Sequence, residues 1–124
     1  MNTVTMEIPP DEWSVFFDDL SREHQSRIVT IEGHGEEAGD QFESHDVPLE
    51  GVSVTLNGDD EVISIVARQD TGKHVMHTVS APLHVMLERT PEGLAKTLHI
   101  ESAHGATTLV RFRPVVIPET IQSA

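Results

Sequence analysis

Four large apolar side chains near the N-terminus are spaced as on the buried face of a helix. They are Trp13, Phe16, Phe17 and Leu20. Their positions follow i, i+3, i+4 and i+7, which places all four on one helical face. Because proline is tolerated in the first helical turn, Pro10 is a suitable start, and the sequence predicts an amphipathic helix over 10–24. The rest of the chain must supply the surface that covers this face.

The remainder of the chain is typical of short strands separated by turns. Apolar runs that alternate or are nearly continuous end at turn signals such as NGDD (57–60) and TPEG (90–93). The predicted strands are 28–32, 41–45, 52–56, 62–67, 74–79, 83–89, 96–102 and 107–113.

This pattern predicts a mainly β (α+β) fold. We expect a single curled antiparallel sheet, or a partly open barrel, of seven to eight strands with the N-terminal amphipathic helix packed on it. With 124 residues, the chain is long enough to bury a core as one domain, 1–124. Within it we expect a β meander over 28–113 and a C-terminal tail, 114–124, that lies across the sheet or frays.

The apolar residues on either side of the turn near 90–95 predict one strand register. They share a core face only if Leu87 pairs with Leu98 and Val85 with Ile100, because a slip of one residue sends one set into water. That register places His84 opposite Glu101. We expect this carboxylate to raise the pKa of His84.

Charge and composition exclude several classes of function. The chain has 21 Asp and Glu against 8 Lys and Arg, a formal charge of −13, which disfavours nucleic acid and anionic membranes as partners. The absence of cysteine excludes thiolate zinc sites, thiol catalysis and iron–sulfur ligation. The N-terminus lacks the features of a secretory signal and the chain has no membrane-spanning apolar run, so we expect a cytoplasmic protein.

Histidines suggest a metal site, and His74 and His77 are the closest pair. On a strand, residues three apart point to opposite faces, so these two rings cannot converge on one ion without a bulge. We expect His77 to share a face with Val75 and Val79 as a half-buried, hydrogen-bonded ring, and His74 to lie in solvent. A role for His77 in binding a ligand or transferring a proton is the alternative.

Segment 33–46 is glycine-rich and acidic, with three glycines, five carboxylates and two histidines. Carboxylates and imidazoles bind hard or borderline cations. The spacing, however, matches no calcium loop, and a solvated loop explains the composition equally well. We therefore predict no metal and no cofactor.

Arg111 and Arg113 alternate with apolar residues in the last predicted strand. If the preceding turn has two residues, His104 and Gly105, then Leu98 faces Arg111 and the guanidinium points to the apolar side of the sheet. Either this strand end is solvent-exposed, or a buried carboxylate or an anionic ligand holds the arginine. Arg111 and Arg113 join His77 as the candidate ligand-binding residues.

Four segments carry a resemblance to a known family: IPPDEWSVFFDDLSREHQ (8–25), HDVPLEGVSV (45–54), HVMHTV (74–79) and LHIESAHGATTLVRFR (98–113). Together they resemble domain-of-unknown-function family 5335, a family of uncharacterised bacterial proteins. The resemblance implies a small stand-alone bacterial domain and carries no activity, ligand or partner onto these residues. The chain departs from the family pattern at 33–44, which is richer in glycine and more acidic.

No sequence motif identifies a catalytic site. The chain has neither a Gly-x-Ser-x-Gly elbow nor a phosphate-binding glycine motif. The leading hypothesis is a non-enzymatic, soluble bacterial accessory domain that binds a partner protein or a small ligand, with homo-oligomerisation as a further expectation. The alternative is a metal-dependent or enzymatic protein that uses His77 or the acidic loop 33–46.

Overall fold

The fold is mainly β with one N-terminal helix, as the sequence predicts. The structure is a computed structural model that describes residues 3–35 and 42–114, so the predicted tail beyond Pro114 lies outside the described residues. The elements are β1 (Val4–Ile8), a 3-10 turn (Pro10–Glu12), α1 (Trp13–Glu23), β2 (Ile28–His34), β3 (Phe42–Asn57), β4 (Asp60–Arg68), β5 (His74–Ser80), β6 (Pro82–Arg89), β7 (Ala95–Ser102) and β8 (Thr107–Phe112).

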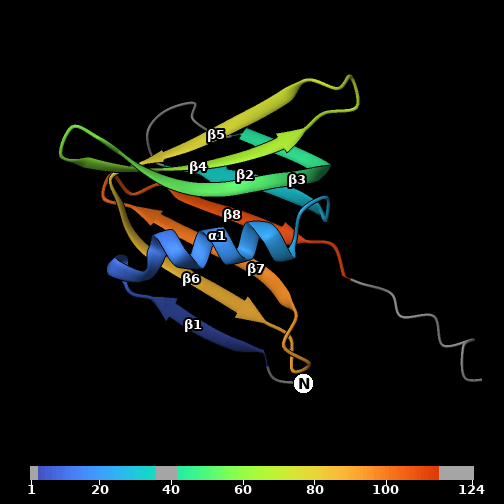
Figure 1. The fold of residues 1–124 in the computed structure, drawn as a ribbon, viewed down its shortest axis with the longest axis horizontal. Coiled ribbons are helices and arrows are strands. Elements are labelled where there is room, and N and C mark those ends of the chain that lie inside the picture. The colour runs from blue at the N-terminus through green and yellow to red at the C-terminus, as the bar shows by residue number, and fades with distance from the viewer. Residues whose placement is uncertain (1–2, 36–41, 115–124) are drawn as a thin grey trace, which may run out of the picture.

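The eight strands form one antiparallel sheet that curls without closing. The strand order is β1-β6-β7-β8-β2-β3-β4-β5, which places β1 and β5 at the edges. In Figure 1, β3, β4 and β5 lie above and β1, β6 and β7 lie below, with α1 running between them. We call β4, β5 and the C-terminal half of β3 the upper arm, and β1, β6, β7 and β8 the lower arm. The helix therefore fills an opening of the curled sheet.

The corner between the two arms lies within β3. Its residues up to Pro48 pair with β2, and those from Leu49 onward pair with β4. The register shifts between Leu49 and Gly51, and Asp46 has a positive φ of 51°. Bulges of this kind bend a strand and increase its twist. The structure thus has one bent strand where the sequence predicts two.

Side chains of α1 enter the core from the open side of the curl. Trp13, Phe17 and Leu20 are at most 3% exposed. Phe16 is half-buried, with its ring centroid 5.3 Å from that of Phe17. The indole Nε1 of Trp13 donates to the carbonyl oxygen of Ile8 at 2.9 Å, which satisfies the one polar atom that this ring buries. The predicted apolar helix face is confirmed.

The predicted register between β6 and β7 is also confirmed. Leu87 pairs with Leu98, and Val85 with Ile100. All four side chains are fully buried, so the requirement for a common core face decides the pairing. His84 lies opposite Glu101, but its closest carboxylate comes from β1: the His84 Nδ1 is 2.7 Å from Oε2 of Glu7.

This geometry predicts which carboxylate controls the titration of His84. The hydrogen bond with Glu7 is the main cause that raises the pKa of His84 above its ordinary value, and the charge of Glu101 adds less. We therefore expect Glu7→Gln to lower the pKa of His84, measured by NMR titration, by more than Glu101→Gln does. A larger effect of Glu101→Gln would contradict this order.

The sign of the coupling to stability follows from the raised pKa. A histidine whose pKa is raised on folding stabilises the native state fully below its unfolded value, 6.5. That contribution is lost as the pH rises through the higher folded value. Glu7→Gln should accordingly reduce stability in mildly acidic solution and leave it nearly unchanged in alkaline solution.

The register between β7 and β8 differs from the prediction by one residue. Leu98 pairs with Val110 rather than with Arg111. The loop has three residues, 103–105, closed by a hydrogen bond from Ser102 N to Ala106 O, and Gly105 takes a φ of 87°. Three-residue hairpins end in such a left-handed residue. The extra loop residue places Arg111 on the outer face, so the expectation of a guanidinium aimed at the apolar side is wrong.

Candidate functional site

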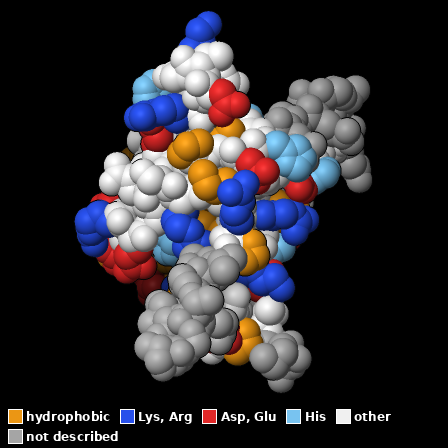
Figure 2. Space-filling model, turned by 90° about the vertical axis from the view of Figure 1, so that its right-hand side faces the viewer, with side chains coloured by type: hydrophobic (Ala, Val, Ile, Leu, Met, Phe, Trp, Pro, Cys, Tyr) orange, Lys and Arg blue, Asp and Glu red, His pale blue; other side chains and the backbone are white. Residues whose placement is uncertain are grey.

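A cavity of about 400 Å³ opens on the outer face of the sheet, where β7, β8, β2 and β3 are neighbours. We call it the cationic groove, because its walls combine three cations and an imidazole with two carboxylates. These residues are Lys96, Arg111, Arg113, His45, Glu32 and Asp46. Figure 2, which faces the end of the molecule where β8 finishes, shows Lys and Arg side chains gathered on this side.

Arg111 and Arg113 define one wall of the groove. They stand two residues apart, so their side chains leave the same face of the strand about 7 Å apart. Arg111 donates from Nε to Oε2 of Glu32 on β2 at 3.2 Å, and an Nη2 of Arg113 lies 3.1 Å from Oδ1 of Asp46 on β3. Both arginine side chains remain about half exposed, at 53% and 55%. Each guanidinium carries five N–H donors, so most of its donors are available to a ligand.

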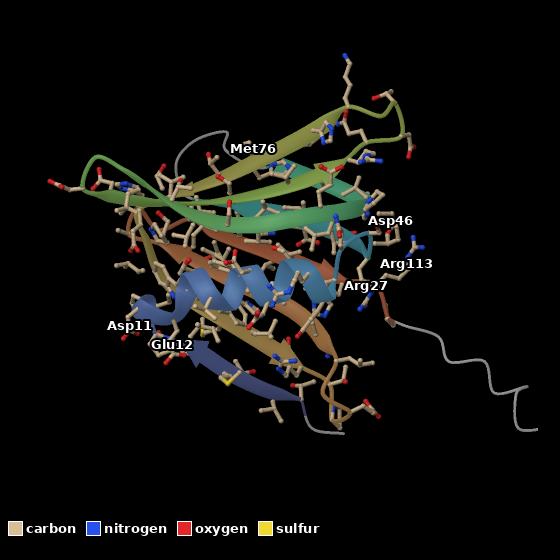
Figure 3. The ribbon with its side chains drawn as sticks, viewed as in Figure 1. Asp11, Glu12, Arg27, Asp46, Met76 and Arg113 are labelled. Carbon is tan, nitrogen blue, oxygen red and sulfur yellow. The ribbon has the colours of Figure 1, made fainter. Side chains whose placement is uncertain are left out.

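The backbone that carries Arg113 is held in place by a third arginine. Arg27 donates from Nη2 to the carbonyl oxygen of Arg113 at 2.8 Å, and its guanidinium lies 5.6 Å from the ring centroid of Phe112. The amide of Arg113 donates to the carbonyl oxygen of Ile28 at 2.9 Å. Figure 3 shows Arg27, Asp46 and Arg113 together at this end of the fold. The end of β8 is therefore fixed before any ligand binds.

The charge of the groove contrasts with that of the chain. Three of the eight Lys and Arg residues line this cavity, although the whole chain carries a formal charge of −13. Each of the three cations has a carboxylate within 4.0 Å: Glu32 for Arg111, Asp46 for Arg113 and Glu88 for Lys96. The groove attracts an anion through the N–H donors that these carboxylates leave open, and not through a net positive charge.

Glu32 orients Arg111 and stays ionised while doing so. A hydrogen bond with His34 is the largest cause that lowers the pKa of Glu32; partial burial opposes it, and the hydrogen bond and charge of Arg111 lower it further. The Nε2 of His34 lies 3.3 Å from Oε1 of Glu32. The carboxylate is thus a permanent anchor for the guanidinium over the neutral pH range.

His77, the third candidate from the sequence, lies elsewhere. It is half-buried on β5, with its Nε2 3.0 Å from Oγ of Ser44 on β3, and it does not line the cationic groove. Burial lowers the pKa of His77, so the ring is neutral at pH 7. The predicted half-buried, hydrogen-bonded ring is confirmed, and the Ser44 contact ties the upper arm to the β2-paired half of β3.

His74 points away from His77, as the strand geometry predicts. It is exposed, with its Nδ1 2.7 Å from Oε1 of Glu50, and Arg68 pairs with the other oxygen of that carboxylate at 2.7 Å. Among the described residues, no three His, Asp or Glu side chains gather into a metal-binding group. Part of the acidic loop, 36–41, lies outside the described residues.

The structure thus brings Arg111 and Arg113 into one site and separates them from His77. Lys96 of β7 and Glu32 of β2 were not predicted as site residues. His45 and Asp46, at the corner of β3, belong to the segment 33–46, which the sequence offered as an alternative cation site and not as part of an anion site. Lys96 and Glu32 are each an isolated charged residue in a strand. Such residues usually lie on the solvated surface without a binding role, so the sequence alone does not mark them. Only the strand order β7-β8-β2-β3 brings them together.

Comparisons with known proteins agree with the resemblance seen in the sequence. A family model described as "Family of unknown function (DUF5335)" matches residues 4–120. The chain is similar to an uncharacterised protein of Aquifex aeolicus (strain VF5), with 28% identity over 116 residues, covering 93% of this chain and 98% of that protein. No solved structure gives a significant match. In the part of the chain that the structure describes, no helix is long and apolar enough to cross a membrane.

Proposed function

The chain belongs to a family of unknown function (DUF5335), and we propose that it is a non-enzymatic binding domain that holds a small anionic ligand in the cationic groove. The observation that carries this proposal is the pair Arg111 and Arg113, two half-exposed guanidiniums on one face of a fixed strand end. Arginine presents its donors in a planar fork that fits carboxylate and phosphate oxygens.

The chemistry of the groove favours binding over proton transfer. Arg111, Arg113 and Lys96 offer N–H donors and no acceptor, which suits them to hold an anion. Glu32 and Asp46 hold the two guanidiniums in place and reduce the entropy that a ligand must remove from them. The cavity volume of about 400 Å³ suits a small molecule, and Thr97, only 3% exposed, lies on its wall.

A titration with inorganic phosphate and with citrate tests this function. At constant ionic strength we expect saturable NMR shifts at the amides of Thr97, Arg111 and Arg113. Removing one charge-assisted hydrogen bond costs about 1.5–3 kcal/mol, so Arg111→Gln and Arg113→Gln should each weaken binding by roughly tenfold or more.

Arg22→Gln is the matched control, because Arg22 is an exposed arginine that also pairs with a carboxylate, Asp19, but lies on α1. Its affinity for both probes should equal that of the original chain. Two outcomes would show that the chain binds anions only through its general charge. One is amide shifts that do not saturate with phosphate or citrate, and the other is a loss of affinity in Arg22→Gln as large as that in Arg111→Gln and Arg113→Gln.

The alternative function is tested on the same samples. The contact between Ser44 and His77 pairs a hydroxyl with a neutral imidazole, an arrangement that can also serve metal binding or catalysis. A titration with zinc, nickel and calcium that shifts the ring signals of His77, while phosphate and citrate leave the groove unchanged, would favour the alternative.

A further inference from the structure

Thr97 places a buried hydroxyl without a hydrogen-bond partner on the wall of the cationic groove. Its side chain is only 3% exposed. Among residues 3–35 and 42–114, no hydrogen bond joins this hydroxyl to another group. In the same part of the chain, every side-chain N or O atom that is sealed from solvent has a partner. The Thr97 hydroxyl is therefore open to the cavity, and only a molecule that enters the groove can satisfy it.

The strand register sets this hydroxyl beside the donors of the groove. Thr97 pairs directly with Arg111, so the two side chains leave the same face of the sheet with their Cβ atoms about 5 Å apart. Arg111 uses Nε to reach Glu32, and this leaves its Nη1 and Nη2 open. The Nζ of Lys96 is 4.0 Å from Oε2 of Glu88, which is beyond hydrogen-bond distance. A ligand thus meets a hydroxyl and several open N–H donors together.

Thr97 differs in this respect from the other buried polar residues of the described chain. Ser102 donates from Oγ to the carbonyl oxygen of Ser80 at 3.0 Å, and the Nδ1 of His24 lies 2.9 Å from the carbonyl oxygen of Leu20. Thr108, which is 4% exposed, lies on the inner face of β8 and does not line the groove. Of these four residues, Thr97 is the one whose side chain can contact a ligand of the groove.

Resting on the function proposed above, we propose that the ligand of the groove is a small hydroxycarboxylate. Its carboxylate binds the open N–H donors of Arg111 and Lys96, and its hydroxyl pairs with that of Thr97. A hydroxyl both donates and accepts, whereas a carboxylate only accepts. A ligand hydroxyl can therefore satisfy Thr97 in either direction. The cations of the groove are already balanced by carboxylates, so hydrogen bonds rather than the number of charges select the ligand.

The burial of Thr97 makes it the residue that sets selectivity. The half-exposed guanidiniums exchange water for any anion, so they distinguish poorly between anions. A ligand without a hydroxyl displaces the water that serves Thr97 and leaves this group unpaired, which lowers affinity. Sites built to hydrogen-bond a ligand hydroxyl reject the analogue that lacks it for this reason.

Citrate and tricarballylate, which differ only in one hydroxyl, test the proposal by calorimetric titration. At about pH 8 the carboxyl groups of both are ionised, and the ionic strength is held constant. We expect the original chain to bind citrate about tenfold more tightly than tricarballylate, and malate more tightly than succinate. Thr97→Val replaces the hydroxyl with a methyl group and should make the affinities within each pair equal. Thr97→Ser keeps the hydroxyl and should restore the preference.

Thr108→Val is the matched control, because it removes a buried hydroxyl from the inner face of the neighbouring strand, and it should leave the preference for citrate intact. The preference is a ratio within one variant, so a loss of folding, which lowers both affinities, does not imitate it. Equal, saturable binding of citrate and tricarballylate by the original chain overturns the hydroxycarboxylate but leaves the groove as an anion site. A preference that survives Thr97→Val overturns Thr97 as its cause. A lack of saturable binding by either compound overturns the proposed function as well.

Discussion

Replacing Phe17 with alanine is expected to lower the free energy of unfolding by about 3–5 kcal/mol. The side chain is 0% exposed and belongs to the core that joins both arms of the sheet. Its removal would leave a cavity lined by residues of the helix and of the curled sheet, which cannot collapse onto it without moving the helix. Urea unfolding followed by circular dichroism measures the loss as a shift of the midpoint.

Two neighbours on α1 provide graded controls for this result. Phe16 is only half-buried, so Phe16→Ala should cost about half as much or less. Val15 is 66% exposed, and Val15→Ala should change stability by under about 0.5 kcal/mol. A cost below about 1 kcal/mol for Phe17→Ala would mean that the helix is peripheral to the fold.

The features that the sequence predicts correctly are those in which burial leaves one choice. The spacing of Trp13, Phe17 and Leu20 permits one buried helix face, and the pairing of Leu87 with Leu98 is the only one that keeps both strands in the core. In both cases the free energy of apolar burial is large compared with local preferences. Such patterns can be read without knowing the strand order.

The features that were missed depend on backbone geometry or on distant pairing. β1 has four exposed residues out of five, so it lacks a burial pattern and forms because β6 offers an edge. The bend in β3 and the three-residue loop at Gly105 each depend on residues with positive φ, Asp46 and Gly105. A one-residue change in loop length reverses which face a side chain takes, which is why Arg111 was assigned to the wrong side.

The candidate site was predicted in part for the same reason. Arg111 and Arg113 stand out because charges alternate with buried residues in one strand. Their carboxylate partners, Glu32 and Asp46, lie 79 and 67 residues earlier in the chain. Only the placement of β8 beside β2 joins them, and that placement follows from the whole sheet rather than from any local pattern.

Ser21→Ala is expected to lower the free energy of unfolding by about 1–2 kcal/mol through two hydrogen bonds. The Ser21 Oγ accepts from the amide of Val52 at 2.8 Å and donates to the carbonyl oxygen of the same residue at 3.0 Å. Alanine would leave both backbone groups of Val52 without these partners. The amide of Val52 should then exchange its hydrogen faster, which NMR measures directly.

Ser14→Ala separates this effect from the higher helix propensity of alanine, because Ser14 is exposed on the same helix and its replacement should be neutral or slightly stabilising. Equal stabilities of the two variants, with unchanged exchange at Val52, would refute the role of the hydroxyl.

The hydrogen bonds of Ser21 matter because of the corner in β3. Once this strand leaves β2 at Pro48, its next residues lose a neighbour on that side. Leu49 is then paired by the backbone of Ser26 and Arg27, and Val52 by Ser21. The end of the helix thus takes the place of a missing strand, and this lets the sheet bend there without exposing unpaired backbone groups.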